Sequence, residues 1–169
     1  MISLSDFEIW YAAEASMPFG IPCSEVVSER CACAGAEKDL LLIFLPGEAE
    51  FFSTKTGLKF PVQDHAFQGH LFQTATLPRG CASCVFGPAC RVAMQRPLEC
   101  RLFPVAPAFL GIGPYFDHCP YQRRVTPEFF SQARLIWDDV ESKVGSEWLA
   151  FYRSFVRVRP TPKPLSSGH

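Results

Sequence analysis

Eight cysteines in a chain of 169 residues constrain this sequence more than any other feature. Five of them lie between residues 81 and 119, within a stretch, 79–122, that is rich in Cys, Pro and Gly. Such a stretch should contain little regular structure, so backbone hydrogen bonds alone would hold it poorly. Bonds from thiolates to a metal are the simplest replacement. The sequence therefore predicts an irregular centre that a metal holds together.

The state of the thiols depends on the compartment, and the first residues bear on it. Residues 1–8 show no positive charges followed by an apolar run, so we expect no secretory signal. The longest apolar run, 40–46, is too short to cross a bilayer. We therefore expect a cytoplasmic protein without a membrane partner, in which reduced thiols bind metal. A disulfide-bonded structural protein and eight buried, merely apolar thiols are the alternatives.

The charge balance argues against nucleic acid as a partner. Lys and Arg total 16 and Asp and Glu total 17, for a formal charge of −1 at pH 7. Binding to a phosphate backbone requires a surplus of cations. The length and the 48% hydrophobic content suit one globular domain. We expect that domain to span 1–159 and the proline-containing end, 160–169, to be a flexible tail.

The apolar pattern predicts an α+β fold that ends in two helices. Thr126 is a good N-cap and Pro127 a good first residue for a helix that ends at Gly145. A second helix should run from Ser146 and stop at Pro160. Both carry apolar residues at three- and four-residue steps, so we expect them to cover the centre of the domain.

Weaker signals place the remaining elements. Ser5 and Glu8 have the spacing of a capping box, which predicts a helix that opens at Ser5. The continuous apolar run Leu40–Leu45 predicts a buried strand. We further expect a short helix over 48–54 and a strand over 70–76.

The spacing of the thiols identifies candidate ligands but not their grouping. Cys81 and Cys84 form a C-x2-C pair, which can wrap one metal in a tight turn. No second such pair follows, so the spacing does not fit a zinc ribbon, a RING domain or a ferredoxin. Zinc and a 4Fe–4S iron–sulfur cluster both remain open. The predicted ligands are Cys31, Cys33, Cys81, Cys84, Cys90, Cys100 and Cys119, with the role of Cys23 left open.

Arginines among these cysteines could balance the charge of the site. Four thiolates around zinc or a 4Fe–4S core leave a net charge of about −2. Burial of that charge is costly without nearby cations. Arg96 and Arg101 are the candidates for binding the cofactor in this way, although either could instead be a solvated surface residue.

Residues 96–104 read Arg-Pro-Leu-Glu-Cys-Arg-Leu-Phe-Pro. They resemble the R-P-x-x-C-R-x-F/Y-P signature of the YkgJ-type cysteine-cluster family, whose domains chelate zinc or iron. The order of motifs over 23–120 is also similar to that family. The first cluster is sparser here, because only Cys31 and Cys33 stand where the family usually has a C-x2-C ending in adjacent cysteines.

The resemblance implies metal binding, and for some relatives, the flagellin lysine methylases, an iron–sulfur cluster. The first hypothesis is therefore a metal-binding protein without catalysis of its own. The second, an iron–sulfur redox enzyme or a protein-lysine methylase-like enzyme, rests on the resemblance alone, because a shared fold is not a shared function. A protein partner is left open by the sequence.

Overall fold

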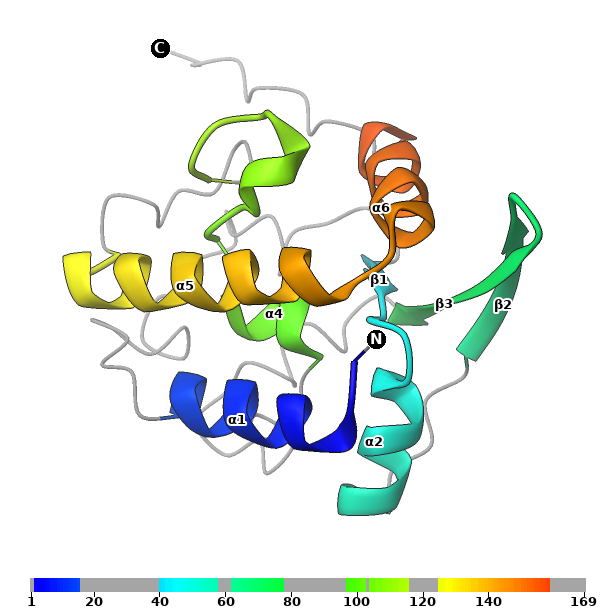
Figure 1. Cartoon of the computed structure of the whole chain (residues 1–169), viewed down its shortest axis with the longest axis horizontal. Coiled ribbons are helices and arrows are strands. Elements are labelled where there is room, and N and C mark those ends of the chain that lie inside the picture. Colours follow the sequence, from blue (N-terminus) through cyan, green and yellow to red (C-terminus); the bar gives the residue numbers. More distant parts are fainter. Residues whose placement is uncertain are drawn as a thin grey trace, which may run out of the picture.

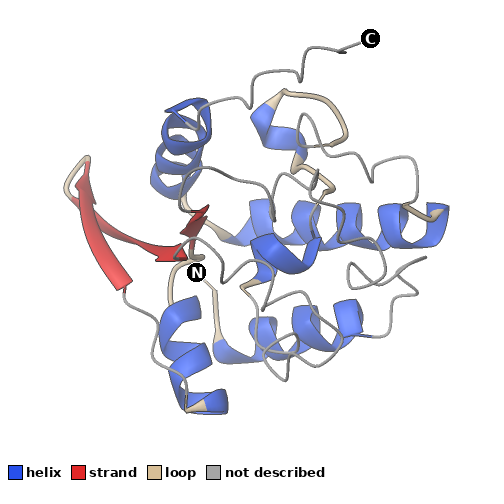
Figure 2. Cartoon of the chain, turned by 180° about the vertical axis from the view of Figure 1, so that it is seen from behind, coloured by secondary structure: helices blue, strands red, loops and turns tan. Residues whose placement is uncertain are grey.

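The computed structural model describes residues 2–15, 40–57, 62–77, 97–102, 104–115 and 125–158. These residues form a three-stranded antiparallel sheet and a set of helices packed around a shared core (Figure 1). The reverse view shows the hairpin of the sheet at one side of the molecule and two stacked helices, Pro127–Lys143 and Leu4–Ala15, toward the other (Figure 2). The predicted α+β class is confirmed at this level.

The sheet has β3 at its centre and β1 and β2 on either side. Its strands are β1 (Leu40–Ile43), β2 (Val62–Phe67) and β3 (His70–Leu77). Leu40 pairs with Leu77 where β1 begins and β3 ends. The strands predicted over 40–45 and 70–76 are confirmed, with β1 two residues shorter than the apolar run.

A tight turn at Gln68 and Gly69 joins β2 to β3. Both residues have positive φ angles, 50° and 81°, as the favoured two-residue hairpin turn requires. The sequence pattern did not predict β2. Its residues alternate only between partly buried and exposed positions, so the strand carries no strong apolar signal.

Helix α1 (Leu4–Ala15) begins with a capping box that lies two residues before the expected one. The Ser3 amide donates to Oδ2 of Asp6 over 2.7 Å, and the Asp6 amide donates to Oγ of Ser3 over 3.3 Å. The expected pair, Ser5 and Glu8, has the same spacing, and Glu8 instead forms an ion pair with Lys55. The correction arises because the sequence offers two serines at the right distance from an acid.

Helix α2 (Glu48–Thr56) follows β1 and confirms the helix predicted over 48–54, with two further residues. Gly57 ends it with a φ of 69°, and its amide donates to the carbonyl of Ser53. A left-handed residue at this position favours glycine because a side chain would strain the backbone. The short helix is thus bounded by its local sequence.

The two C-terminal helices are α5 (Pro127–Lys143) and α6 (Ser146–Val158), as predicted. Thr126 caps α5, since its Oγ1 accepts from the amide of Phe129 over 3.1 Å. The side chains that α5 buries recur at three- and four-residue steps: Phe129, Ala133, Ile136, Trp137 and Val140. The predicted apolar stripe is therefore the face that packs into the core.

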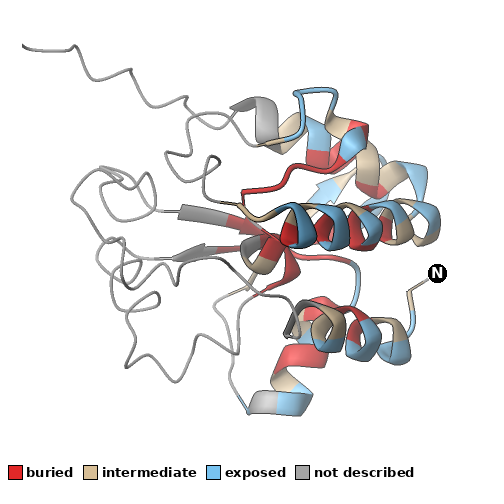
Figure 3. Cartoon of the chain, turned by 90° about the vertical axis from the view of Figure 1, so that its left-hand side faces the viewer, coloured by how far each residue is buried: buried red, intermediate tan, exposed pale blue. Residues whose placement is uncertain are grey.

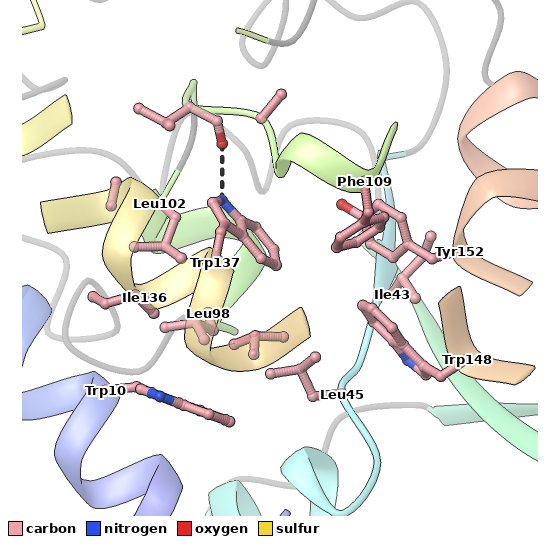
Figure 4. Packing of buried hydrophobic residues seen from close by; sticks show 14 of the residues in the cluster. Trp10, Ile43, Leu45, Leu98, Leu102, Phe109, Ile136, Trp137, Trp148 and Tyr152 are labelled. Atoms are coloured by element: carbon pink, nitrogen blue, oxygen red, sulfur yellow. Dashed lines mark hydrogen bonds between the residues drawn. The ribbon is translucent and has the colours of Figure 1, made fainter. Parts of the chain in front are cut away.

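The core is rich in aromatic residues that come from all the major helices. Figure 3 shows buried positions concentrated on the inward sides of the elements. Trp10, Trp137 and Trp148 are each at most 2% exposed. Figure 4 shows Trp137 beside Leu98 and Leu102, which belong to the segment that carries the resemblance to the cysteine-cluster family. That segment is therefore part of the core.

The expected irregular centre, 79–122, is described only over 97–102 and 104–115. This part contains a short helix, α4 (Leu98–Leu102), a 3-10 turn, η3 (Ala108–Leu110), and a bridge between Val105 and Tyr115. Side chains of α5 and α6 donate to its carbonyls: Trp137 to Val105, Arg134 to Ala106 and Arg153 to Phe109.

Packing and side-chain hydrogen bonds therefore hold the described part of this stretch. The other cysteines of the stretch lie outside the described residues, and so does the tail predicted over 160–169. No helix among the described residues combines the length and apolar character that crossing a membrane demands.

Candidate metal centre

Of the predicted site residues, the structure describes Arg101 in full and Cys100 by its backbone. Both lie in α4. The other candidates lie outside the described residues: Cys31, Cys33, Cys81, Cys84, Cys90, Cys119 and Arg96. What the structure describes is therefore the setting of Cys100.

Helix α4 is a short piece fixed by its neighbours. It has five residues, too few for an isolated helix to be stable. Leu98 and Leu102 are both 0% exposed and belong to the main core. The helix contacts α1 and β1, and Figure 1 shows it between α1 and α5. Cys100 thus lies on a turn whose backbone the core holds in place.

Glu99, next to Cys100, ties α4 to the sheet and to α6. Its Oε2 accepts from the amide of Ile43 over 3.0 Å, and its Oε1 accepts from the hydroxyl of Tyr152 over 2.9 Å. The side chain is only 6% exposed. A buried carboxylate is tolerated when donors surround it, so these two bonds fix α4 relative to β1 and α6.

Glu48 ties α4 to α1 and α2. Its Oε1 accepts from the amide of Leu98 and from the hydroxyl of Tyr11, both over 2.6 Å. Its Oε2 accepts from the amide of Leu45 over 2.8 Å. Burial raises the pKa of Glu48 to about 7, against the lowering effect of the hydrogen bonds, and the nearby charge of Glu99 raises it further.

Arg101 extends from α4 over an aromatic ring of α1. Its Cζ lies 4.5 Å from the ring centroid of Tyr11. The Tyr11 ring packs against Phe51 and Phe52 of α2, with centroids 5.4 Å away in each case. The cation of Arg101 therefore rests on an aromatic ring that two phenylalanines of α2 also contact.

Described residues that flank the four cysteine-bearing segments are linked through the sheet and α4. Leu40, which follows the segment of Cys31 and Cys33, pairs with Leu77, which precedes the segment of Cys81, Cys84 and Cys90. Glu99, beside Cys100, bonds to Ile43 of the same strand. Tyr115, four residues before Cys119, pairs with Val105, which follows α4. Two of these flanking residues are thus paired in the sheet whose first strand bonds to α4, and the other two lie in α4 or pair just after it.

Among the described residues, no three His, Cys, Asp or Glu side chains are grouped so that they could hold a metal ion. Glu48 and Glu99 flank α4, but each of their four carboxylate oxygens already accepts a hydrogen bond. These carboxylates accept hydrogen bonds from backbone amides and tyrosine hydroxyls around α4. A metal here would rely on thiolates, and the described acids offer no alternative ligand set.

Sequence reasoning missed Tyr11, Glu48 and Glu99. Glu99 occupies a variable position of the R-P-x-x-C-R signature, and Glu48 is only the first residue of the helix predicted over 48–54. An acid at a helix start is usually solvated, so nothing local indicates that either side chain is buried. The signal that could have pointed to Glu48 is its place directly after a buried apolar run.

The chain matches no protein-family model, no curated protein and no solved structure. The link to the cysteine-cluster family therefore rests on the residues quoted above and stays a resemblance.

Proposed function

We propose that this protein binds zinc or a 4Fe–4S cluster through cysteine thiolates gathered around α4. The observation that supports this most is that described residues flanking the cysteine-bearing segments are linked to one another and to α4. Leu40 and Leu77 are direct partners in the sheet, and Glu99 bonds to Ile43 of the same strand. A metal site built from distant parts of a chain needs such a meeting point.

Chain length permits the thiols to meet. Cys33 lies seven residues before Leu40, and Cys81 lies four residues after Leu77. An extended chain spans at most about 3.5 Å per residue, so these cysteines reach at most about 25 Å and 14 Å from their strand ends. Since partnered strand residues lie about 5 Å apart, both thiols can reach one metal.

Charge is the second line of support. A tetrathiolate centre carries a charge of about −2, which favours a nearby fixed cation. Arg101 is adjacent to Cys100 and rests on Tyr11. The proposal includes a reducing, cytoplasmic location, because thiolate ligands require reduced cysteines. The proposed function is metal binding. An enzyme that uses a bound iron–sulfur centre would be an extension of this proposal.

The test is the metal content of the full chain purified without oxygen. We expect about one zinc or one cluster per chain, in line with a four-thiolate site. A brown protein with broad visible absorption would identify the iron–sulfur form, and a colourless protein that contains zinc would identify the other. Cys81→Ser, Cys84→Ser and Cys100→Ser should each lose most of the metal.

Ser83→Ala is the matched control, because it alters the same C-x2-C turn without removing a thiol. It should keep its metal. Titration of the denatured, metal-free chain separates the remaining alternative. Eight free thiols support the proposal, whereas none would establish a disulfide-bonded protein. A wild-type chain that neither contains metal nor takes it up on reconstitution would refute the proposal.

A further inference from the structure

Arg101 is held by a chain of contacts that begins at a buried acid. The acid is Glu48, which is 0% exposed. Its Oε1 bonds to the hydroxyl of Tyr11 over 2.6 Å and to the amide of Leu98 over 2.6 Å. The ring of Tyr11 then lies under the guanidinium, 4.5 Å from its Cζ. One carboxylate oxygen thus fixes both the aromatic platform and the helix on which the cation stands.

The ring of Tyr11 is fixed on more than one side. It meets Phe51 at an interplanar angle of 36° and Phe52 at 84°, so α2 supports one part of the ring while Glu48 holds the hydroxyl. An arginine above an immobile aromatic ring loses little further freedom when it stays there. The arrangement is that of a preorganised cation.

We propose that Tyr11 is a positioning residue, which holds the cation of Arg101 beside Cys100 so that it offsets the negative charge of a thiolate metal centre. This inference rests on the proposed function and assigns a role to a residue outside every cysteine motif. Arg101 directly follows Cys100 in α4, and its guanidinium carries a permanent positive charge. The proposed effect of Tyr11 on the metal passes through Arg101.

The competing explanation is that Tyr11 merely stabilises the fold. A double-mutant cycle separates these two explanations. For each variant the rate of metal release to a chelator is measured, and the thermal stability is recorded as well. We expect Tyr11→Leu and Arg101→Gln each to release metal about fivefold faster than wild type, the size of effect typical of such cation contacts. The double variant should release metal no faster than Arg101→Gln alone, because the ring of Tyr11 then has no cation to position.

Two further variants sharpen the test. Tyr11→Phe keeps the ring beneath Arg101 and removes only the bond to Glu48, so it should release metal more slowly than Tyr11→Leu. Arg101→Lys keeps the charge but loses the planar stacking, so it should restore part of the retention lost in Arg101→Gln.

Lys143→Gln provides the matched control. Lys143 lies over Trp10, the neighbour of Tyr11 on α1, at 5.4 Å from the ring centroid, yet it belongs to α5 and not to α4. Its loss should lower stability without changing metal release. The inference is overturned if the effects of Tyr11→Leu and Arg101→Gln add, or if Lys143→Gln releases metal as fast as Tyr11→Leu. Wild-type protein that binds no metal would overturn the proposed function and this inference together.

Discussion

Oε1 of Glu48 lies 2.6 Å from the backbone nitrogen of Leu98, which joins the start of α2 to the first residue of α4. The same side chain accepts from Tyr11 and Leu45, so three donors from separate parts of the chain converge on one buried carboxylate. Loss of such an acceptor leaves buried donors without a partner, which costs more than an average hydrogen bond contributes. The setting of Cys100 therefore depends on a residue far from it in sequence.

Glu48 should make the protein less stable as the pH rises from about 5 to 7. Its pKa in the folded state is about 7, above the ordinary 4.5, so the folded state binds the proton more tightly than the unfolded state. The resulting stability is complete below the unfolded pKa and is lost as the pH passes the folded pKa. A shift of this size corresponds to about 3 kcal/mol in the free energy of unfolding.

Denaturant unfolding of wild type and Glu48→Gln across this pH range measures the effect. Glutamine does not titrate, so the variant should show a flatter dependence on pH while its metal content is monitored. Parallel curves for the two proteins would mean that Glu48 does not hold its proton more tightly when folded.

Asp6 should make the protein less stable as the pH falls, and at a lower pH than the effect of Glu48. Nζ of Lys143 lies 2.7 Å from its Oδ1, and this bond, with those from Ser3, holds the pKa of Asp6 well below its ordinary value of 3.8. The stability it contributes is present above that ordinary value and is lost as the pH falls further. Asp6→Asn should therefore lower the Tm at neutral pH, and the difference should shrink in acid.

Asp138→Asn is the comparison for Asp6→Asn. Asp138 is 58% exposed and pairs with Arg134 at 3.7 Å, a surface ion pair that should contribute little. Its Tm should stay close to that of wild type at both pH values. If the two variants behave alike, the bonds of Asp6 do not stabilise the N-terminal helix.

The elements that the sequence predicted are those with strong local signals. Helix α5 has an N-cap threonine, a proline in its first turn and a regular apolar stripe, all within one stretch of chain. The strand at Leu40 is a continuous apolar run, and α2 ends at a glycine. Each signal depends on residues only a few positions apart, so no knowledge of the tertiary fold was needed.

The missed elements owe their structure to distant residues. Strand β2 forms because β3 lies beside it, with Val62 opposite Ala75 and Phe67 opposite His70. Helix α4 is stabilised by buried leucines and by the acceptors Glu48 and Glu99. Packing outweighs local propensity at both places, so a local pattern could not reveal them.

The candidate site divides in the same way. Spacing and composition make Cys100 and Arg101 candidates, because thiols and cations are recognisable by type. They did not identify Tyr11 or Glu48, which matter through contacts that bring α1, α2 and α4 together. A sequence can therefore indicate which groups could bind a metal, but the residues that position those groups emerge only from the fold.

Trp137 should hold the segment after α4 in place. Its Nε1 donates to the carbonyl of Val105 over 3.0 Å in the core, as the dashed line in Figure 4 shows. Trp137→Phe would leave that carbonyl without this donor, and we expect a loss of about 1–3 kcal/mol in unfolding free energy. Limited proteolysis should then cut faster within 104–115.

Trp148→Phe is the control for this segment. Trp148 also donates from its indole, over 3.0 Å, but its acceptor is the carbonyl of Phe44 next to β1. It should lower stability by a similar amount without selective cleavage within 104–115. Equal cleavage patterns in the two variants would show that Trp137 stabilises the core as a whole and not this segment.

Gln68 occupies a backbone conformation that glutamine disfavours, so a residue better suited to it should stabilise the β2–β3 turn. Its φ is 50°, and Gly69 follows at 81°. Asparagine tolerates the left-handed region better than glutamine, and Asn-Gly is the preferred pair for such a turn. Gln68→Asn should raise the unfolding free energy by about 0.4–1 kcal/mol, a gain of the size seen when a residue suits its native backbone.

Gln63→Asn tests whether the conformation of the turn is the cause. Gln63 is an exposed residue of β2 paired with Thr74, where the backbone is extended and asparagine is disfavoured. That variant should leave the Tm unchanged or lower it slightly, whereas Gln68→Asn should raise it. A Tm that falls in both variants would show that glutamine at position 68 is stabilised by something other than its backbone, since the turn would then gain nothing from a residue suited to positive φ.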